Sequence, residues 1–248
     1  TNERDAKISD DADNREPKFY KRQMLVSYED SDIHAAYKID AEDVVFGFDF
    51  VKKLTIKDVN FGVPDNQSEQ SSVAGDEDYR TGFKVCNKCG MVKTSKSRSF
   101  KHDLTCAYNK TPEKALDEEN FIDCLYLYRE LSSEAVRILL PVSSYSANSA
   151  NEATFAAAIQ LGIKLYFKGS IDHIKSTVYS EPVNAGEGRR YYLVIYDTVP
   201  GGTRYLKSLM ASPENLLDLV ERSFRKLDSC SCNQDPSKDG CYKCIYAY

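Results

Sequence analysis

No apolar run in this sequence is long enough to span a bilayer, and its first residues lack the charged-then-apolar order of a signal peptide. These absences argue against membrane insertion and against secretion, so we expect no membrane partner and a cytoplasmic location. The nucleotide-binding pattern G-x-x-x-x-G-K-[ST] is also missing. Because the sequence starts at Thr1 and stops abruptly at Tyr248, we expect it to be an excised region of a larger protein.

The eight cysteines are the most informative residues that are present. Without a signal peptide they indicate metal binding or reduced thiols, not disulfides. Seven of them fall into two clusters: C-x2-C-x12-H-x3-C, formed by Cys86, Cys89, His102 and Cys106, and C-x-C-x8-C-x2-C, formed by Cys230, Cys232, Cys241 and Cys244. Four such ligands can converge on one tetrahedral zinc ion. The sequence therefore predicts two zinc ions, both structural, because neither set leaves an open coordination position.

The first cluster begins as a zinc knuckle, in which two thiolates come from one tight turn and Gly90 relieves the crowded backbone. His102 and Cys106 are one helical turn apart, so a short helix would place both on one face. The residues between the ligand pairs are polar where an independent groove-reading finger needs an apolar core. The pattern favours a ribbon-like structural knuckle on a larger domain.

Cys124 is the one cysteine outside the two clusters, and it has no ligand partner nearby in the sequence. A ligand or a reactive thiol is one interpretation of such a residue. A small buried core residue is the interpretation that we favour.

The hydrophobic pattern predicts an α+β fold, with a mixed or antiparallel sheet, a few packed helices and the two zinc knuckles. Strands are expected over 44–51, 54–61, 121–129, 135–141, 163–167, 174–180 and 191–196. The last of these is apolar throughout and is the best candidate for a central strand. Helices are expected over 152–161, ended by Gly162, and over 216–227, where apolar residues recur at helical spacing.

Composition divides the chain into four segments. Residues 1–22 are polar and charged, and we expect a flexible lead-in. Residues 23–79 form a β-rich acidic segment, whose part 62–79 is expected to be a flexible loop. Residues 80–112 are a zinc-knuckle insertion, and residues 113–248 are an α+β domain that contains the four-cysteine cluster.

The net charge of −5 argues against a uniformly basic nucleic-acid binder, but the charge is unevenly distributed. Residues 1–79 are acidic, whereas residues 80–110 are basic apart from Asp103. Such a run is either a solvated face or a patch that faces phosphates. On the second interpretation, the candidate phosphate contacts are Lys93, Lys96, Arg98 and Lys101.

A Pro-Gly-Gly turn follows the expected central strand. One interpretation is a loop of free backbone amides that contacts a phosphate or a partner's backbone. The other is a sharp strand–helix turn in which Asp197 accepts hydrogen bonds from turn amides. The candidate contacts to nucleic acid or to a partner are Asp197, Pro200, Gly201, Gly202, Thr203 and Arg204.

No residue is assigned a catalytic role. A metal-dependent nuclease could in principle use Glu152 and Asp197, but no D/E-x-K spacing supports that pair. A pure protein-interaction scaffold is a further alternative.

The run Y-D-x-V-P-G-G-T-x-Y-L from Tyr196 to Leu206 is followed by Cys230-x-Cys232 and by G-C-Y-x-C-I-Y-x-Y from Gly240 to Tyr248. Together these runs resemble the zinc-binding C-terminal domain of bacterial and archaeal mitomycin-repair (MrfA-type) superfamily 2 DNA helicases. They are also similar to helicase-associated proteins of DISARM-like antiphage systems. The likeness is dense over about 195–248 and looser over 120–195.

The resemblance implies a four-cysteine structural zinc and attachment to a DNA helicase, either in the same chain or as a partner subunit. It implies a supporting role in DNA binding and 3′–5′ translocation, in repair or in antiphage defence. The ATPase motifs of such a helicase are not in this segment, so the segment should not hydrolyse ATP alone. Arg204 departs from the family pattern, which commonly has Gly there, and makes the loop less permissive and more basic.

Overall fold

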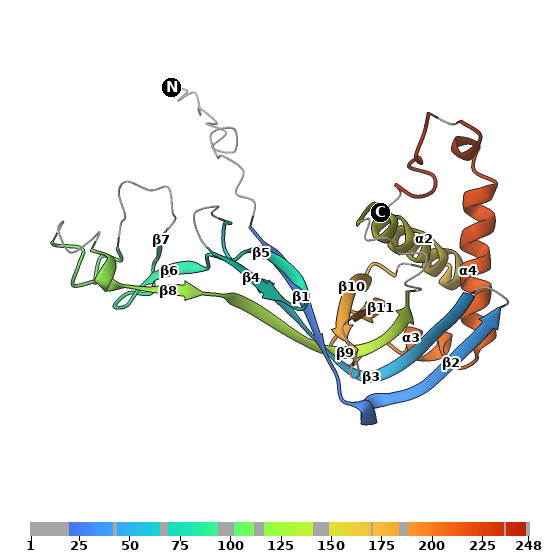
Figure 1. Cartoon of the computed structure of the whole chain (residues 1–248), viewed down its shortest axis with the longest axis horizontal. Helices are drawn as coiled ribbons and strands as arrows, with labels where there is room; N and C mark the ends of the chain where they lie inside the picture. The colour runs from blue at the N-terminus through green and yellow to red at the C-terminus, as the bar shows by residue number, and fades with distance from the viewer. Residues whose placement is uncertain are drawn as a thin grey trace, which may run out of the picture. The chain divides into compact units, whose positions relative to one another are not determined.

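The structure, a computed structural model, describes residues 20–41, 44–64, 69–93, 102–111, 117–140, 149–169, 171–183, 188–235 and 237–246. The chain divides into two compact units (Figure 1). The first consists of Thr1–Gln23, Asn60–Ser71 and Glu77–Leu127, and the second of Met24–Val59, Ser72–Asp76 and Tyr128–Tyr248. Most of the lead-in predicted over 1–22 lies outside the described residues.

A six-stranded sheet forms the framework of the second unit. Its path is β1-β3-β9-β11-β10, with β2 paired to β3. The strands are β1 (Arg22–Ser27), β2 (Ile33–Ala41), β3 (Val44–Asn60), β9 (Leu127–Leu139), β10 (Ile174–Pro182) and β11 (Arg189–Asp197). β11 pairs antiparallel with both β9 and β10 and is buried from Tyr192 to Asp197. The predicted α+β fold is confirmed, and so is the central position of the apolar strand.

β3 is one long strand where the sequence suggested two. The expected break falls between Val51 and Leu54, which are both fully buried in the same hydrophobic cluster. Lys52 and Lys53 between them are exposed. Lys52 and Lys53, which suggested a break between two strands, therefore face solvent within one continuous strand.

Helix α2 (Ser149–Phe167) continues through Gly162, where the pattern predicted a helix end and then a strand over 163–167. Gly162 faces α4 (Pro213–Asp228): a Cβ there would lie 2.6 Å from Leu219 Cδ2 and 2.9 Å from the Leu219 carbonyl oxygen. The glycine therefore permits close helix packing and does not terminate the helix. None of the described helices is long and apolar enough to cross a membrane.

Buried side chains lie on both faces of the sheet. On one face, Ile138 and Leu193 pack with buried residues of α2 and α4, which lie side by side in Figure 1. On the other face, Val194 packs with Val51 and with partly buried residues of β1. Because neighbouring side chains of a strand alternate between faces, Arg137 and Tyr192 belong to the second face.

The first unit contains a three-stranded sheet in the order β7-β6-β8. Its strands are β6 (Phe83–Cys86), β7 (Val92–Lys93) and β8 (Phe121–Leu125), and β6 pairs antiparallel with both neighbours. A 3-10 helix, η2 (Glu118–Asn120), leads into β8. This sheet positions the first cysteine cluster.

Part of the segment 62–79, which we predicted to be a flexible loop, forms paired strands β4 (Gln70–Val73) and β5 (Asp76–Tyr79). Ala74 and Gly75 join them with φ values of 51° and 82°. Two consecutive positive φ values are typical of the tightest hairpin turns. The prediction of a flexible loop was wrong because these strands consist mostly of polar residues and lack the alternation of apolar and polar residues that indicates a strand.

Cys124 is exposed, so its interpretation as a buried core residue was wrong. It has a φ of 57°, and only Phe121 of β8 is buried. A Cβ on Gly82 would lie 2.8 Å from Cys124 Cα, so the backbone of Cys124, and not its side chain, makes the close contact.

Candidate functional site

The first cluster brings Cys86, Cys89, His102 and Cys106 together, with their ligand atoms within 4.8 Å of one another. The Sγ atoms of Cys86 and Cys106 lie 4.0 Å apart. His102 Nδ1 lies 3.5 Å from Cys89 Sγ and 3.6 Å from Cys106 Sγ. Around tetrahedral zinc these edges would be about 3.8 Å between sulfurs and about 3.5 Å between sulfur and nitrogen. The three thiols and one imidazole therefore fit a zinc ion.

Local turns, not a helix, present these ligands. Cys86 ends β6, and the Gly90 N–H donates to its carbonyl oxygen at 3.0 Å. Gly90 has a φ of 71° with open space around it, so the turn needs its backbone freedom and not its small size. His102 and Cys106 belong to a turn in which the Cys106 N–H donates to the Asp103 carbonyl oxygen, so the predicted short helix was wrong.

Backbone amides support negative charge at the first cluster. The Lys88 N–H donates to Cys86 Sγ at 3.4 Å. Burial raises the pKa of the Cys89 thiol, but hydrogen bonds from the amides of Met91 and Asp103 and from His102 outweigh it and lower that pKa to about 6. A thiolate is the form that binds a metal, so this environment favours coordination.

The second cluster is more compact. The Sγ–Sγ distances are 3.4 Å for Cys230–Cys232, 3.3 Å for Cys232–Cys244, 3.6 Å for Cys241–Cys244 and 3.5 Å for Cys230–Cys241. These values are close to the roughly 3.8 Å edges of a zinc–tetrathiolate tetrahedron. Amides again face the sulfurs: the Cys241 N–H donates to Cys244 Sγ at 3.3 Å, and the Lys243 N–H donates to Cys241 Sγ at 3.4 Å.

The thiol pKa values of the second cluster move in opposite directions. The amide and thiol of Cys232, and then the thiol of Cys241, lower the pKa of Cys230 to about 7. Hydrogen bonding with Cys244 and Cys230 raises the pKa of Cys232 to about 12. One thiolate is thus stabilised at the expense of its neighbours, and a central divalent cation would allow all four to ionise.

The donor sets identify the metal and its role. Thiolate and imidazole donors in a tetrahedron suit zinc, and sites with four protein ligands are structural because no position remains for substrate or water. The two clusters therefore fit two structural zinc ions, in agreement with the sequence.

Asp197 holds the Pro-Gly-Gly loop in place through hydrogen bonds to its buried carboxylate. Its side chain is fully buried, Oδ1 accepts the Val199 N–H at 2.8 Å, and Oδ2 accepts the Thr203 N–H at 2.7 Å and the Thr203 hydroxyl. The amides of Gly201 and Gly202 donate to carbonyl oxygens within the second unit. These amides are therefore not free to bind a phosphate, and the structure favours the sharp-turn interpretation.

Glu134, on β9, is a site residue that sequence reasoning missed. It is 5% exposed, and the backbone amides of Arg204, Leu206 and Lys207 at the start of α3 (Tyr205–Leu209) favour its ionised form, while its Oε1 has no hydrogen-bond partner among the described residues. Burial, with the nearby charge of Asp197, raises its pKa. No local pattern marks Glu134 in the sequence, because the amides that act on its carboxylate lie far away along the chain.

The predicted contact residues of this loop differ in exposure. Pro200, Gly201 and Arg204 are exposed, whereas Gly202 and Thr203 are half-buried. Arg204 has a φ of 69°, a conformation that glycine adopts at lower cost. A glycine at position 204, which the resemblance described above would lead us to expect, would therefore adopt this backbone conformation with less strain than Arg204.

The remaining candidate residues are dispersed. Lys93 donates to Glu118 Oε1 at 2.7 Å and lies 4.8 Å from the centre of the Phe121 ring, while Lys96, Arg98 and Lys101 lie outside the described residues. Glu152 is in the first turn of α2. Among the described residues, no group of three or more possible His, Cys, Asp or Glu ligands forms besides the two cysteine clusters.

A comparison with family models found a match over part of the chain. The family model described as the MrfA Zn-binding domain (MZB) matches residues 155–245, which include the Asp197 loop, α4 and all four cysteines of the second cluster. The first cluster lies outside the match. A comparison with curated proteins found no match.

One solved structure, described as the crystal structure of the DUF1998 helicase MrfA bound to DNA, is similar with a TM-score of 0.44 and 10% sequence identity. The similarity covers 92% of this chain and 22% of that chain, so this chain spans about a fifth of its length.

Proposed function

We propose that this chain is an accessory, zinc-stabilised part of a DNA helicase, because residues 155–245 match the family model described as the MrfA Zn-binding domain. The helicase core would be in the same polypeptide or in a partner subunit, and it would supply ATP hydrolysis. This chain would support DNA binding and translocation without catalysing a reaction alone. The parent helicase would act in DNA repair or in antiphage defence.

One observation carries this proposal: four thiols converge at zinc geometry inside the segment that the family model matches. A closed coordination set supports folding, not catalysis. The nuclease alternative gains no support, since both oxygens of Asp197 accept hydrogen bonds from its own loop and no acidic ligand group forms with Glu152 among the described residues.

Arg204 is the strongest candidate for a DNA phosphate contact in the matched segment. It is exposed, and it directly follows the Gly-Gly-Thr run. An exposed arginine can form charge-assisted hydrogen bonds with a phosphate. The same phosphate contact would make binding depend on salt.

The experiment measures binding of a fluorescent single-stranded oligonucleotide to zinc-loaded protein between about 50 and 200 mM salt. We expect Arg204→Gln to weaken binding several-fold and to reduce the slope of log K against log salt by about 1. Arg225→Gln is the matched control, because it removes one charge from an exposed arginine on α4. Equal loss in both variants, or no DNA binding by the wild type, would contradict the proposal.

A second measurement addresses the nuclease alternative. The zinc-loaded chain is incubated with DNA and Mg²⁺ or Mn²⁺, and we expect intact DNA. Cleavage that disappears in Asp197→Ala would replace the accessory role with an enzymatic one.

A further inference from the structure

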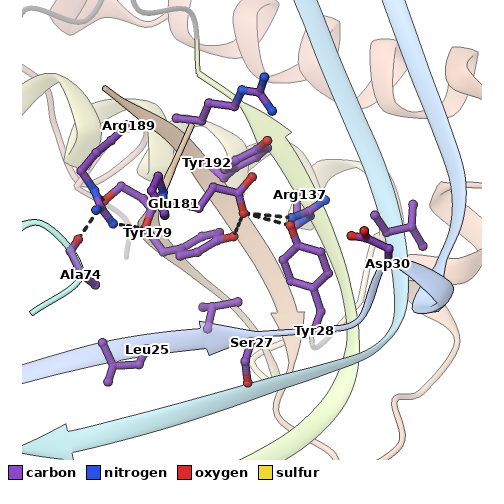
Figure 2. Close-up of a pocket in the computed structure, with 15 residues that line it drawn as sticks. Leu25, Ser27, Tyr28, Asp30, Ala74, Arg137, Tyr179, Glu181, Arg189 and Tyr192 are labelled. Carbon is purple, nitrogen blue, oxygen red and sulfur yellow. Dashed lines mark hydrogen bonds and ion pairs between the residues drawn. The ribbon is translucent and has the colours of Figure 1, made fainter. Parts of the chain in front are cut away.

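A pocket of about 730 Å³ lies in the second unit, on the side of the sheet that bears Arg137 and Tyr192 (Figure 2). Residues of β1, β2, β9, β10 and β11 line it, together with Tyr28 and Asp30 between β1 and β2 and Ala74 from the β4–β5 turn. Its volume is within the range of small-molecule sites, about 300–1,000 Å³. None of the zinc-cluster or loop residues considered above lines this pocket.

A buried polar network forms one wall. Arg137 makes a bidentate pair with Asp49, with Nε 2.8 Å from Oδ1 and Nη2 2.7 Å from Oδ2. Tyr28 donates to Glu181 Oε2 at 2.9 Å, and the Tyr179 hydroxyl donates to the same oxygen. Figure 2 shows Arg137 of β9, Tyr28 just after β1 and Tyr179 of β10 converging on Glu181, which is also on β10.

The protonation states in this wall are well defined. Burial raises the pKa of Tyr192 to about 12, so its hydroxyl remains protonated at neutral pH. Burial also opposes ionisation of Glu181, but hydrogen bonds from Tyr179 and Tyr28 outweigh it and lower the Glu181 pKa. The wall therefore presents a carboxylate, tyrosine hydroxyls and a guanidinium.

The guanidinium is incompletely satisfied. The Arg137 side chain is 4% exposed, and among the described residues its Nη1 has no hydrogen-bond partner. The Nη1 atom lies 3.7 Å from Glu181 Oε2, which is too long for a hydrogen bond. A buried guanidinium N–H that faces a cavity can donate to an acceptor group that enters the cavity.

The surrounding charges limit the chemistry of that acceptor. The Arg137 guanidinium already lies over the Tyr28 ring at 3.9 Å and the Tyr192 ring at 4.9 Å, so a cationic ligand would meet a like charge there. An anion at the same place would meet Glu181. A neutral acceptor with an aromatic face fits both constraints, because it can accept from Nη1 and pack among tyrosines.

The residues at the rim of the pocket favour a negatively charged group, whereas those around Arg137 favour a neutral one. Arg189 and Arg190 both line the pocket, and Arg190 is exposed. Arg189 is held by Ser180, with its Nε donating to Ser180 Oγ at 2.8 Å and its Nη2 to the Ser180 carbonyl oxygen at 2.7 Å. Two arginines at the rim against Asp30 favour a negatively charged group there, and a phosphate suits them.

We propose that this pocket binds one nucleotide of a single nucleic-acid strand, with the base among Tyr28, Tyr179 and Tyr192 and the phosphate at Arg189 and Arg190. A base carbonyl or ring nitrogen accepts from Arg137 Nη1, and an exocyclic amine donates to Glu181. The inference deepens the proposed function and rests on it, because that function brings a single strand to this domain.

The experiment compares two short oligonucleotides with the same phosphates, one containing bases with a central 2-aminopurine and one abasic throughout. We expect the base-containing strand to bind roughly 5- to 150-fold more tightly, the value of stacking one base, and its 2-aminopurine emission to fall on binding. Tyr28→Leu abolishes this difference, whereas Tyr28→Phe retains the ring and most of the difference. Arg190→Gln weakens both strands equally.

Phe224→Leu is the matched control, because it removes an exposed ring on α4 that does not line the pocket, and it leaves the preference unchanged. Deoxyribose and ribose versions of the strand, and free mononucleotides, identify which source of nucleotide binds most tightly. Equal binding of the base-containing and abasic strands overturns the pocket proposal while leaving the accessory DNA-binding function in place. Absence of binding by either strand contradicts both.

Discussion

The two cysteine clusters meet the same coordination requirement with very different amounts of regular structure around them. In the first, Cys86 ends a strand, and Cys86 and Cys106 pack with Phe121, the first residue of the neighbouring β8. In the second, the four cysteines follow α4, and the regular structure among them is one 3-10 helix, η4 (Ser231–Gln234). The second cluster therefore has to obtain more of its folding free energy from the metal.

The two clusters also differ in the ion pairs that surround them. Glu118 accepts from Lys84 at 2.6 Å and from Lys93 at 2.7 Å, so it connects η2 to both β6 and β7 beside the first cluster. Within the described part of the second cluster, the ion pair is the local one between Lys238 and Asp235, at 2.9 Å. Strand pairing and ion pairs can preserve part of the first site when the metal is lost. The second site has no comparable support among its described residues.

The largest expected effect follows from loss of a ligand in the second cluster. Cys232→Ser should reduce the zinc content from two ions to one per chain and unfold the segment after α4, because structural zinc supplies roughly 10–16 kcal/mol of apparent binding free energy. Metal analysis and hydrogen exchange over residues 230–244 measure both effects. Cys124→Ser, a change at an exposed cysteine outside the clusters, should retain both ions. Protected amides over 230–244 in metal-depleted Cys232→Ser would refute the dependence on zinc.

A smaller structural effect is expected from the corresponding change in the first cluster. Cys106→Ser should also remove one zinc ion, but the backbone pairing of β6 with β8 does not depend on that thiol. We expect exchange in 83–86 and 121–125 to accelerate by about tenfold or less, or about 1.4 kcal/mol of local stability. Complete loss of protection there would remove the contrast between the two clusters.

The smallest effect concerns the ion pairs beside the first cluster. Lys84 and Lys93 lower the pKa of Glu118 to about 2. A lowered pKa in the folded state means that the contribution is present above the unfolded value, near 4.5, and is lost as the pH falls toward 2. Because Glu118 is exposed, Glu118→Gln should cost only about 0.2–1 kcal/mol at neutral pH.

The measurement for Glu118 is the difference in free energy of unfolding between the wild type and Glu118→Gln, at neutral pH and again near pH 4. The difference should shrink at the lower pH and in 1 M salt, which screens exposed pairs. A difference that grows as the pH falls would show that the carboxylate is not stabilised by the lysines.

Local patterns in the sequence predicted much of the fold. The apolar run at β11 and the helical spacing of α4 were sufficient because both signals arise within a few residues. Gly162 was misread, since a glycine that permits helix packing has the same local appearance as one that ends a helix. The division of the chain at residues 22, 79 and 112 stays a prediction.

The two zinc sites were predictable from ligand spacing alone, whereas Glu134 and the Arg137 pocket were not. Glu134 lies far in sequence from the loop amides that influence its pKa. Arg137, Asp49 and Glu181 come from three different strands, and no spacing within one segment brings them together. Such groups meet only when strands pair.

What the sequence determined by itself is the identity of the metal ligands, because tight turns bring the paired Cys and His residues close within short segments and their chemistry selects zinc. Tertiary structure decided what the Pro-Gly-Gly loop can do. Folding buries Asp197 beneath the loop, where it accepts hydrogen bonds from amides that the sequence had left open to a phosphate, and it places Glu134 near the start of α3. Buried backbone groups take the nearest available partner, and only the packed sheet establishes which partner is near.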